Sequence, residues 1–171
     1  TIGNGSASLD GSSDYINCGT GLTDITSGAF TVAGWYKFDD VSGAATLFNR
    51  GVGTSTSGYR LEYQTDPRII AFGKHASGYH YINYDYTFVA DTWYHIAWVN
   101  GGTSSESALY VNGIQGATKT WGSDIVSASA LDFKIGVNAG GTNEFDGNIA
   151  QVGWWSTALT QAQVQEVKEK S

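Results

Sequence analysis

The sequence predicts an all-β domain, built from two packed antiparallel sheets and closed by one short C-terminal helix. Short runs of alternating apolar and polar residues recur between clusters of Gly, Ser and Asp, at the spacing of a β-sandwich. The 171 residues include 23 Gly, 1 Pro and 13% aromatic residues, a composition that favours strands joined by tight turns. Only the last dozen residues carry a helical pattern.

The strand pattern repeats along most of the chain. In order, the runs span residues 30–38, 45–50, 59–64, 68–74, 78–88, 93–100, 108–111, 131–137 and a last run that ends at Trp155. Tyr59, Leu61 and Tyr63 alternate with polar residues, which indicates a strand with one buried face.

Turn and cap residues mark the boundaries of two elements. The pair Asn112-Gly113 stands between two runs and is the strongest short-range signal for a β-hairpin. Thr160 followed by Gln163 forms the pattern of a capping box, which predicts the start of the closing helix.

The charge of the chain limits the classes of partner that it could bind. There are 16 Asp and Glu against 9 Lys and Arg, and the cations are spread along the sequence. A phosphate backbone requires a clustered basic face, so we expect no nucleic-acid partner. No apolar run approaches the roughly 18 residues of a membrane span, so we expect no membrane insertion. The acidity fits an extracellular, cell-surface or virion-associated protein.

We expect a single domain over residues 1–171, because no internal repeat or linker-like stretch interrupts the chain. The chain opens at Thr1 and contains no Met, which we interpret as a mature product or a piece of a larger protein. The single Cys18 cannot form an internal disulfide, and its alternating surroundings predict a small buried hydrophobic residue.

The order of motifs carries a family resemblance. Over about residues 7–167 the chain contains, in order, SLDGSSDYINCG, FTVAGWYKFDD, TLFNRG, YRLEY, DTWYHIAWVNG, ALYVNG, FKIG and FDGNIAQVGWW…ALTQAQV. This order resembles laminin-G-like domains of the concanavalin A-like lectin/glucanase superfamily, which includes pentraxins and carbohydrate-binding modules. The resemblance implies a jelly roll that binds ligands on a concave face or on a rim of loops. It also implies that Trp35, Trp93, Trp98 and Trp155 lie in the core.

A rim calcium ion is common in domains of this kind. The resemblance assigns its ligands to loops 52–58 and 138–146, and the first loop offers no carboxylate. Calcium takes roughly six to eight oxygen ligands, usually with several carboxylates, so we expect no tight Ca²⁺ site. The weak metal-ligand candidates in the second loop are Asn138, Asn143, Glu144 and Asp146.

The superfamily also includes glycoside hydrolases, which need two carboxylates roughly 5 to 9.5 Å apart across the sugar bond. The close acids Glu144 and Asp146 lie in a turn before the last strand, and Glu62 is interpreted as a surface ion pair with Arg60. We therefore predict no catalytic residues and no enzyme. A hydrolase acting through Glu62 or Glu144 is the disfavoured alternative.

The stretch 78–88 holds most of the candidate ligand residues. His80, Ile82, Tyr84, Tyr86 and Phe88 share one face of the strand, which we expect in the core. The other face carries aromatic and polar side chains suited to sugar rings and hydroxyls. With two residues from neighbouring segments, the candidate carbohydrate-binding set is Tyr79, Tyr81, Asn83, Asp85, Trp121 and His75.

Two alternatives stay open for these residues. Tyr is common on sheet surfaces for cross-strand pairing, so the exposed face of 78–88 is also compatible with a purely structural role. Trp121 is equally compatible with a lid folded over the core, because large aromatics are seldom left fully exposed.

We predict a non-catalytic, lectin-like module that binds a polysaccharide or glycan. The alternative is a structural or adhesion domain of an extracellular or phage virion protein, with a protein partner.

Overall fold

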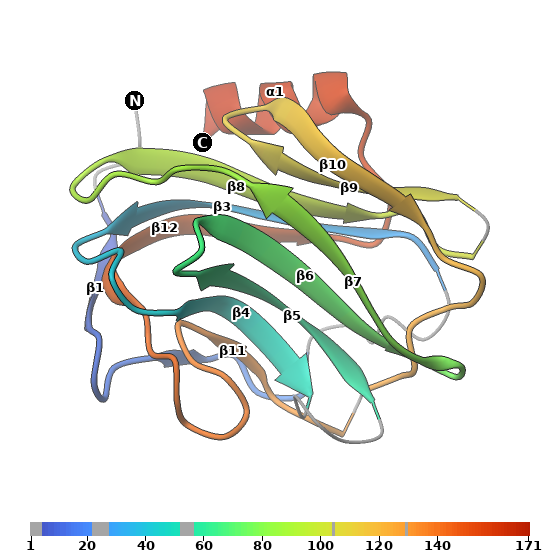
Figure 1. The fold of residues 1–171 in the computed structure, drawn as a ribbon, viewed down its shortest axis with the longest axis horizontal. Coiled ribbons are helices and arrows are strands. Elements are labelled where there is room, and N and C mark those ends of the chain that lie inside the picture. The colour runs from blue at the N-terminus through green and yellow to red at the C-terminus, as the bar shows by residue number, and fades with distance from the viewer. Residues whose placement is uncertain (1–4, 22–27, 52–56, 104, 129) are drawn as a thin grey trace.

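The computed structural model describes residues 5–21, 28–51, 57–103, 105–128 and 130–171. Two antiparallel sheets of six strands each pack face to face, as the sequence predicts for a jelly-roll sandwich (Figure 1). Sheet A contains, in spatial order, β1 (Ala7–Asp10), β12 (Asp146–Trp155), β3 (Phe30–Phe38), β8 (Trp93–Asn100), β9 (Glu106–Val111) and β10 (Ile114–Thr120). Sheet B contains β2 (Ile16–Asn17), β11 (Phe133–Ile135), β4 (Ala45–Gly51), β5 (Gly58–Gln64), β6 (Arg68–His75) and β7 (Gly78–Asp85).

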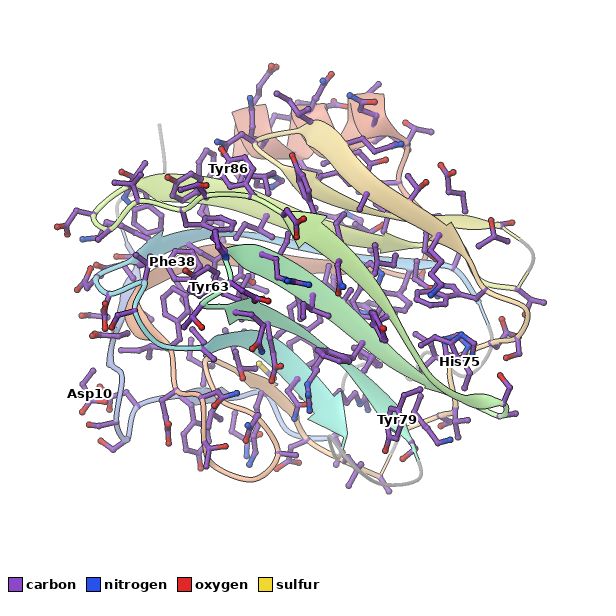
Figure 2. All side chains as sticks on the ribbon, viewed as in Figure 1. Asp10, Phe38, Tyr63, His75, Tyr79 and Tyr86 are labelled. Carbon is purple, nitrogen blue, oxygen red and sulfur yellow. The ribbon has the colours of Figure 1, made fainter. Side chains whose placement is uncertain are left out.

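The core between the sheets is rich in aromatic rings. Phe30 of β3 lies against Trp98 of β8 and Tyr59 of β5, with ring centroids 5.1 and 5.2 Å apart. Phe38 contacts Tyr63 in the same way at the other end of the sandwich, between the two layers (Figure 2). The period-two pattern of β5 is therefore confirmed, because Tyr59, Leu61 and Tyr63 are all buried.

A second, smaller apolar cluster lies on the opposite side of sheet A. The helix α1 (Gln161–Lys170) covers this face and buries Val164 against Ala97, Val99 and Tyr110. Its start is the predicted capping box, in which the hydroxyl of Thr160 accepts from the backbone N–H of Gln163 and the Gln163 side chain accepts in return.

The predicted hairpin is also confirmed. Asn112 and Gly113 have φ of 52° and 77°, the left-handed pair that a tight hairpin turn requires, and they join β9 to β10. Strand β10 itself was not among the predicted runs. It is an edge strand whose residues are almost all exposed, so its sequence carries no buried face to detect.

Several burial predictions are wrong. Cys18 is exposed, because it follows the two-residue edge strand β2 and no strand covers it on that side among the described residues. Trp35 and Trp93 are only partly buried, because both point to the outer face of sheet A, whereas Trp98 alternates to the inner face and belongs to the main core. Trp155 is partly buried and packs in the cluster under α1.

Among the described residues, no helix has the length and apolar character needed to cross a bilayer.

Candidate functional site

The outer face of sheet B presents a line of side chains that crosses all six strands. Each residue of this line is paired in register with the next, and its neighbours along the strand point inward. We call it the cross-strand row, and it consists of Asn17, Lys134, Asn49, Arg60, Phe72 and Tyr81. With neighbouring strands about 4.8 Å apart, the row is roughly 24 Å long.

Aromatic rings gather at the β6–β7 end of the row. Tyr79 and Tyr81 are 44% and 50% exposed, although both are large and partly apolar. The ring of Phe72 lies 6.2 Å from that of Tyr81. Tyr79 projects near the tip of the β6–β7 hairpin, beside the same face (Figure 2). These rings form a preformed, rigid surface on which a ligand could stack.

Cationic groups lie against these rings. The guanidinium carbon of Arg60 is 4.4 Å from the Phe72 ring centroid, and Nζ of Lys74 is 5.1 Å from that of Tyr79. Lys119, on the neighbouring strand β10, places its Nζ 5.3 Å from the Tyr81 ring and donates to the Tyr81 carbonyl oxygen at 3.2 Å. Cation–π attraction stabilises each of these contacts and holds the ammonium groups at the surface.

The other end of the row repeats this pairing. Nζ of Lys134 on β11 lies 5.2 Å from the ring centroid of Tyr15, which is 47% exposed. Along the chain the cations are dispersed. The sheet register brings these distant cations onto one face, which no local pattern could indicate.

Two hollows adjoin the row. One, of about 300 Å³, lies at the β4–β11 end and is lined by Asn49, Gly51, Ala130, Leu131, Asp132, Lys134 and Ala139. The other, beside Phe72 and Tyr79, has about 20 Å³, the space of roughly one water molecule. The aromatic end is therefore an open surface, and of these two hollows the one at the β11 end has room for a ligand group to enter.

Four of the candidate ligand residues share this face. Tyr79, Tyr81, Asn83 and Asp85 alternate with the buried Ile82 along β7, as the period-two interpretation requires. The carboxylate of Asp85 lies 3.8 Å from Nε of Arg68, so an ion pair on the neighbouring strand already engages it.

The other two candidates are inside the protein. His75 and Trp121 are 0% and 1% exposed, with ring centroids 5.0 Å apart. Nδ1 of His75 lies 2.6 Å from the carbonyl oxygen of Ser123, and burial lowers the pKa of its imidazole. Trp121 thus adopts the lid position that the sequence left open, and neither ring has surface with which to contact a ligand.

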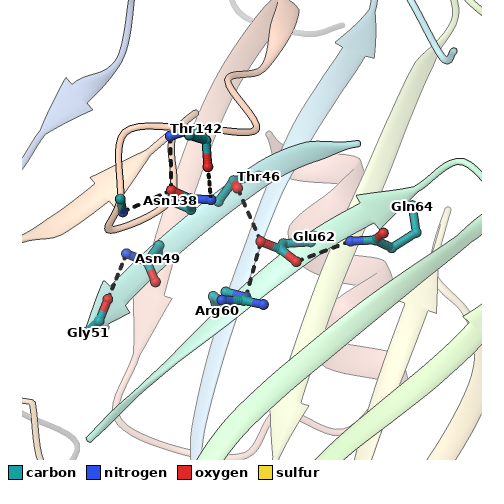
Figure 3. A network of polar contacts seen from close by, with 9 residues as sticks. Thr46, Asn49, Gly51, Arg60, Glu62, Gln64, Asn138 and Thr142 are labelled. Atoms are coloured by element: carbon teal, nitrogen blue, oxygen red, sulfur yellow. Dashed lines mark hydrogen bonds and ion pairs between the residues drawn. The ribbon is translucent and has the colours of Figure 1, made fainter. Parts of the chain in front are cut away.

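The burial of Glu62 differs from the expectation of a surface ion pair. This residue was interpreted as part of a surface ion pair, but it is 1% exposed, although it belongs to the outer face of β5. Its carboxylate lies 3.1 Å from Nε of Arg60 and accepts from the Gln64 side chain at 3.2 Å (Figure 3). Burial raises the pKa of Glu62, and the cation of Arg60 opposes that shift.

The rim loop 138–146 explains why Glu62 is covered. The side chain of Asn143 hydrogen-bonds to Glu62, and the Asn143 carbonyl accepts from the backbone N–H of Thr46 at 2.8 Å. Asn138 organises the same loop, since its Oδ1 accepts from the backbone N–H groups of Gly140 and Thr142 at 2.9 and 3.0 Å (Figure 3). The Asn143 carbonyl oxygen and Asn138 Oδ1 thus already accept hydrogen bonds from other residues of the chain.

The remaining metal-ligand candidates lie apart from that network. Glu144 is partly exposed in the loop, and Asp146 begins β12 opposite Asp10. Of loop 52–58, residues 52–56 lie outside the described residues. In the described part of the chain, no group of three or more His, Cys, Asp and Glu is arranged to hold a metal ion. The expectation about calcium stays a prediction.

Comparison with solved structures shows related architectures. Domain 4 of AbnA, a GH43 extracellular arabinanase from Geobacillus stearothermophilus in complex with arabinotriose, superposes with a TM-score of 0.76 at 21% identity, over 95% of this chain and 76% of that one. CBM40 of the Ruminococcus gnavus IT-sialidase, bound to α2,3-sialyllactose, gives 0.70 at 14% identity, over 84% of each chain.

A heptameric SAP-like pentraxin from Limulus polyphemus is a third relative in fold. It gives a TM-score of 0.66 at 19% identity, over 94% of this chain and 80% of that one. At these identities the likeness establishes the shared fold. No curated protein matches the sequence significantly.

The sequence itself matches one family over nearly its whole length. Residues 10–165 match the family described as the Concanavalin A-like lectin/glucanases superfamily, of laminin-G type. The two six-stranded sheets and the shared fold of the solved structures agree with that match. The chain therefore belongs to the concanavalin A-like lectin/glucanases superfamily.

Proposed function

We propose that this domain is a non-catalytic, lectin-like module that binds a carbohydrate on the outer face of sheet B. The observation that carries the proposal is the pair of half-exposed rings, Tyr79 and Tyr81, beside Phe72 on the cross-strand row. Aromatic faces stack on the C–H surfaces of sugar rings, and rings already held in place lose little entropy on binding. Asn83 lies on the same face with its Oδ1 atom buried, and the Asn17 side chain already donates to Asp132.

Two relatives in fold support this assignment by what they bind. The arabinanase domain is in complex with arabinotriose, and the sialidase module is bound to sialyllactose. The arabinanase is also extracellular, which supports an extracellular or cell-surface location for this domain as part of a larger protein.

A hydrolytic function lacks support at the atomic level. Retaining and inverting glycosidases place two carboxylates across one sugar bond. Glu62, the buried acid of sheet B, is engaged by Arg60, Gln64 and Asn143. No second carboxylate takes part in this network among the described residues. Glu62 thus acts as a structural acid beneath the row.

Binding to an array of neutral and acidic glycans, followed by titration with each glycan that is retained, tests the proposal. Tyr81→Ala should weaken binding about fivefold, the equivalent of about 1 kcal/mol for one stacked ring. Tyr81→Phe should retain most of the affinity, because the ring persists. Ile114→Ala is the matched control, since Ile114 is 63% exposed on sheet A and lies away from the row. Absence of any retained glycan, or equal affinity of Tyr81→Ala and wild type, would contradict the proposal.

One observation favours a protein partner as the second candidate function. An apolar hollow of about 490 Å³ lies between the end of β12 and α1, lined by Trp155, Leu159, Gln163, Glu166, Val167, Lys170 and Ser171. Exposed apolar surface of this kind is typical of docking sites. Self-association through it should appear in sedimentation velocity as a concentration-dependent mass that Leu159→Glu removes; a strict monomer would argue against self-association there.

A further inference from the structure

Some cations of this acidic chain form ion pairs with carboxylates, and others do not. The formal net charge is −7, yet Arg60, Lys74 and Lys134 lie on the proposed binding face of sheet B, and Lys119 reaches the Tyr81 ring of that face from the edge strand β10 of sheet A. They come from four different strands, β5, β6, β10 and β11, that only the fold brings together.

Three of the five cations elsewhere in the molecule have acidic partners among the described residues, whereas Arg50 donates to backbone carbonyl oxygens and Lys168 has no carboxylate within ion-pair distance. Lys37 lies 3.1 Å from Asp39, Arg68 pairs with Asp66, and Lys170 pairs with Glu166. On the face, Arg60 pairs with the buried Glu62. The three lysines on or beside this face have no carboxylate within ion-pair distance among the described residues, namely Lys74, Lys119 and Lys134.

The aromatic rings hold these ammonium groups at the surface. Lys74, Lys119 and Lys134 each lie 5.1 to 5.3 Å from the ring centroid of an exposed Tyr. A ligand that stacks on Tyr79 or Tyr81 therefore brings its substituents within reach of an uncompensated positive charge. A neutral sugar would leave that charge unused, whereas an anionic substituent would form a charge-assisted hydrogen bond with it.

We infer that the carbohydrate bound on this face is an acidic polysaccharide, one whose sugar units carry carboxylate or sulfate groups. The inference rests on the proposed function and names its ligand class. The exposed rings of Tyr79 and Tyr81 at the β6–β7 end would hold the sugar, whereas Asn49, in the middle of the row, is buried.

The arrangement disfavours nucleic acid as the polyanion. Duplex DNA carries about one charge per 1.7 Å and needs a dense basic surface. Here Lys134 is separated from Lys74 by strands β4 and β5, and Asp132 lies beside Lys134 at the β11 hollow, where its carboxylate accepts from Asn17 at 2.8 Å. The rest of the acidic chain would repel a densely charged backbone.

The test uses the whole chain with matched glycan pairs. Each acidic glycan retained on the array is compared with its carboxyl-reduced or desulfated form, and a single-stranded oligonucleotide is included as a generic polyanion. We expect the acidic form to bind and the neutralised form to bind at least fivefold more weakly. Raising NaCl from about 50 to 500 mM should weaken the acidic form and leave any neutral glycan almost unaffected, since salt screens exposed charges.

Charge variants assign the effect to the face. Lys74→Gln, Lys119→Gln and Lys134→Gln should each weaken binding of the acidic glycan about two- to fivefold and reduce its salt dependence. Lys170→Gln removes the same charge from α1 and should change neither. All four positions are at least partly exposed, so folding should be unaffected, as circular dichroism would check.

The possible outcomes distinguish failure of the acidic-ligand inference from failure of carbohydrate binding itself. Retention of neutral glycans with equal affinity for the acidic forms would overturn this inference and leave the proposed function standing. Oligonucleotide binding equal to that of the acidic glycans would also overturn the inference, in favour of a non-specific polyanion surface. Retention of no glycan at all would overturn the proposed function, and the inference with it.

Discussion

Acid should weaken this fold through one histidine beneath the helix. His95 of β8 is 1% exposed, and among the described residues neither ring nitrogen has a hydrogen-bond partner. Its ring lies 5.4 Å from that of Trp35, whose indole N–H donates to the hydroxyl of Ser171 at the end of α1. Burial, and secondarily the charge of Lys168, lowers the pKa of His95 from 6.5 to about 4.

The sign follows from the two states. In the unfolded chain His95 binds a proton near pH 6.5, whereas in the folded protein it does so only near pH 4. The unfolded state therefore holds more protons between these values, and stability falls as the pH falls from 6.5 to about 4. The shift corresponds to about 3 kcal/mol of unfolding free energy lost at pH 4, relative to pH 7.5.

Urea unfolding of wild type and His95→Phe at pH 7.5 and pH 4 measures this effect. Any constant cost of the substitution cancels in the comparison, as do the titrations of the other groups. Wild type should lose about 3 kcal/mol more than the variant between the two pH values. An equal loss in the two proteins would refute the reasoning, because it would mean that His95 accepts its proton at the ordinary pKa inside the fold.

Three further predictions concern the lid, the buried acid and the helix cap. Trp121→Ala should cost about 3 to 5 kcal/mol in urea unfolding, as expected for a buried aromatic, whereas Tyr81→Ala should cost less than about 1 kcal/mol; similar costs would contradict the lid assignment. Because the pKa of Glu62 is raised above 4.5, wild type should lose stability relative to Glu62→Gln as the pH rises from 4.5 to 7.5, and a constant difference would argue against it. Thr160→Ala should lower the unfolding free energy by about 1 kcal/mol, with Ser156→Ala as the unaffected control.

The strands and caps could be predicted because their signals are local. Period-two alternation located β3 and β8 to the residue, and the Asn112-Gly113 turn and the Thr160 capping box are likewise encoded within a few positions. Strand β10 could not be predicted, because it lies at a sheet edge with both faces exposed and its sequence therefore carries no alternation.

The candidate site was predictable only in part, for the same reason. Period-two alternation predicts Tyr79 and Tyr81 on the outer face, because the apolar Ile82 of the same strand belongs to the buried face. Applying the same alternation from Ala71 would have placed Phe72 beside them. The burial of Glu62 had no such signal, since the loop residue Asn143 that covers it is remote in sequence.

The sequence by itself determined the family, the positions of most strands and the two exposed tyrosines, because turns, caps and side-chain alternation depend on neighbouring residues. Tertiary structure alone decided which strands meet, and therefore that Arg60, Lys74 and Lys134 share one face of sheet B while Trp121 closes over the core. The physical reason is register: pairing between strands is set by the packing of the whole sandwich, and a shift of one residue would turn each of these side chains to the opposite face.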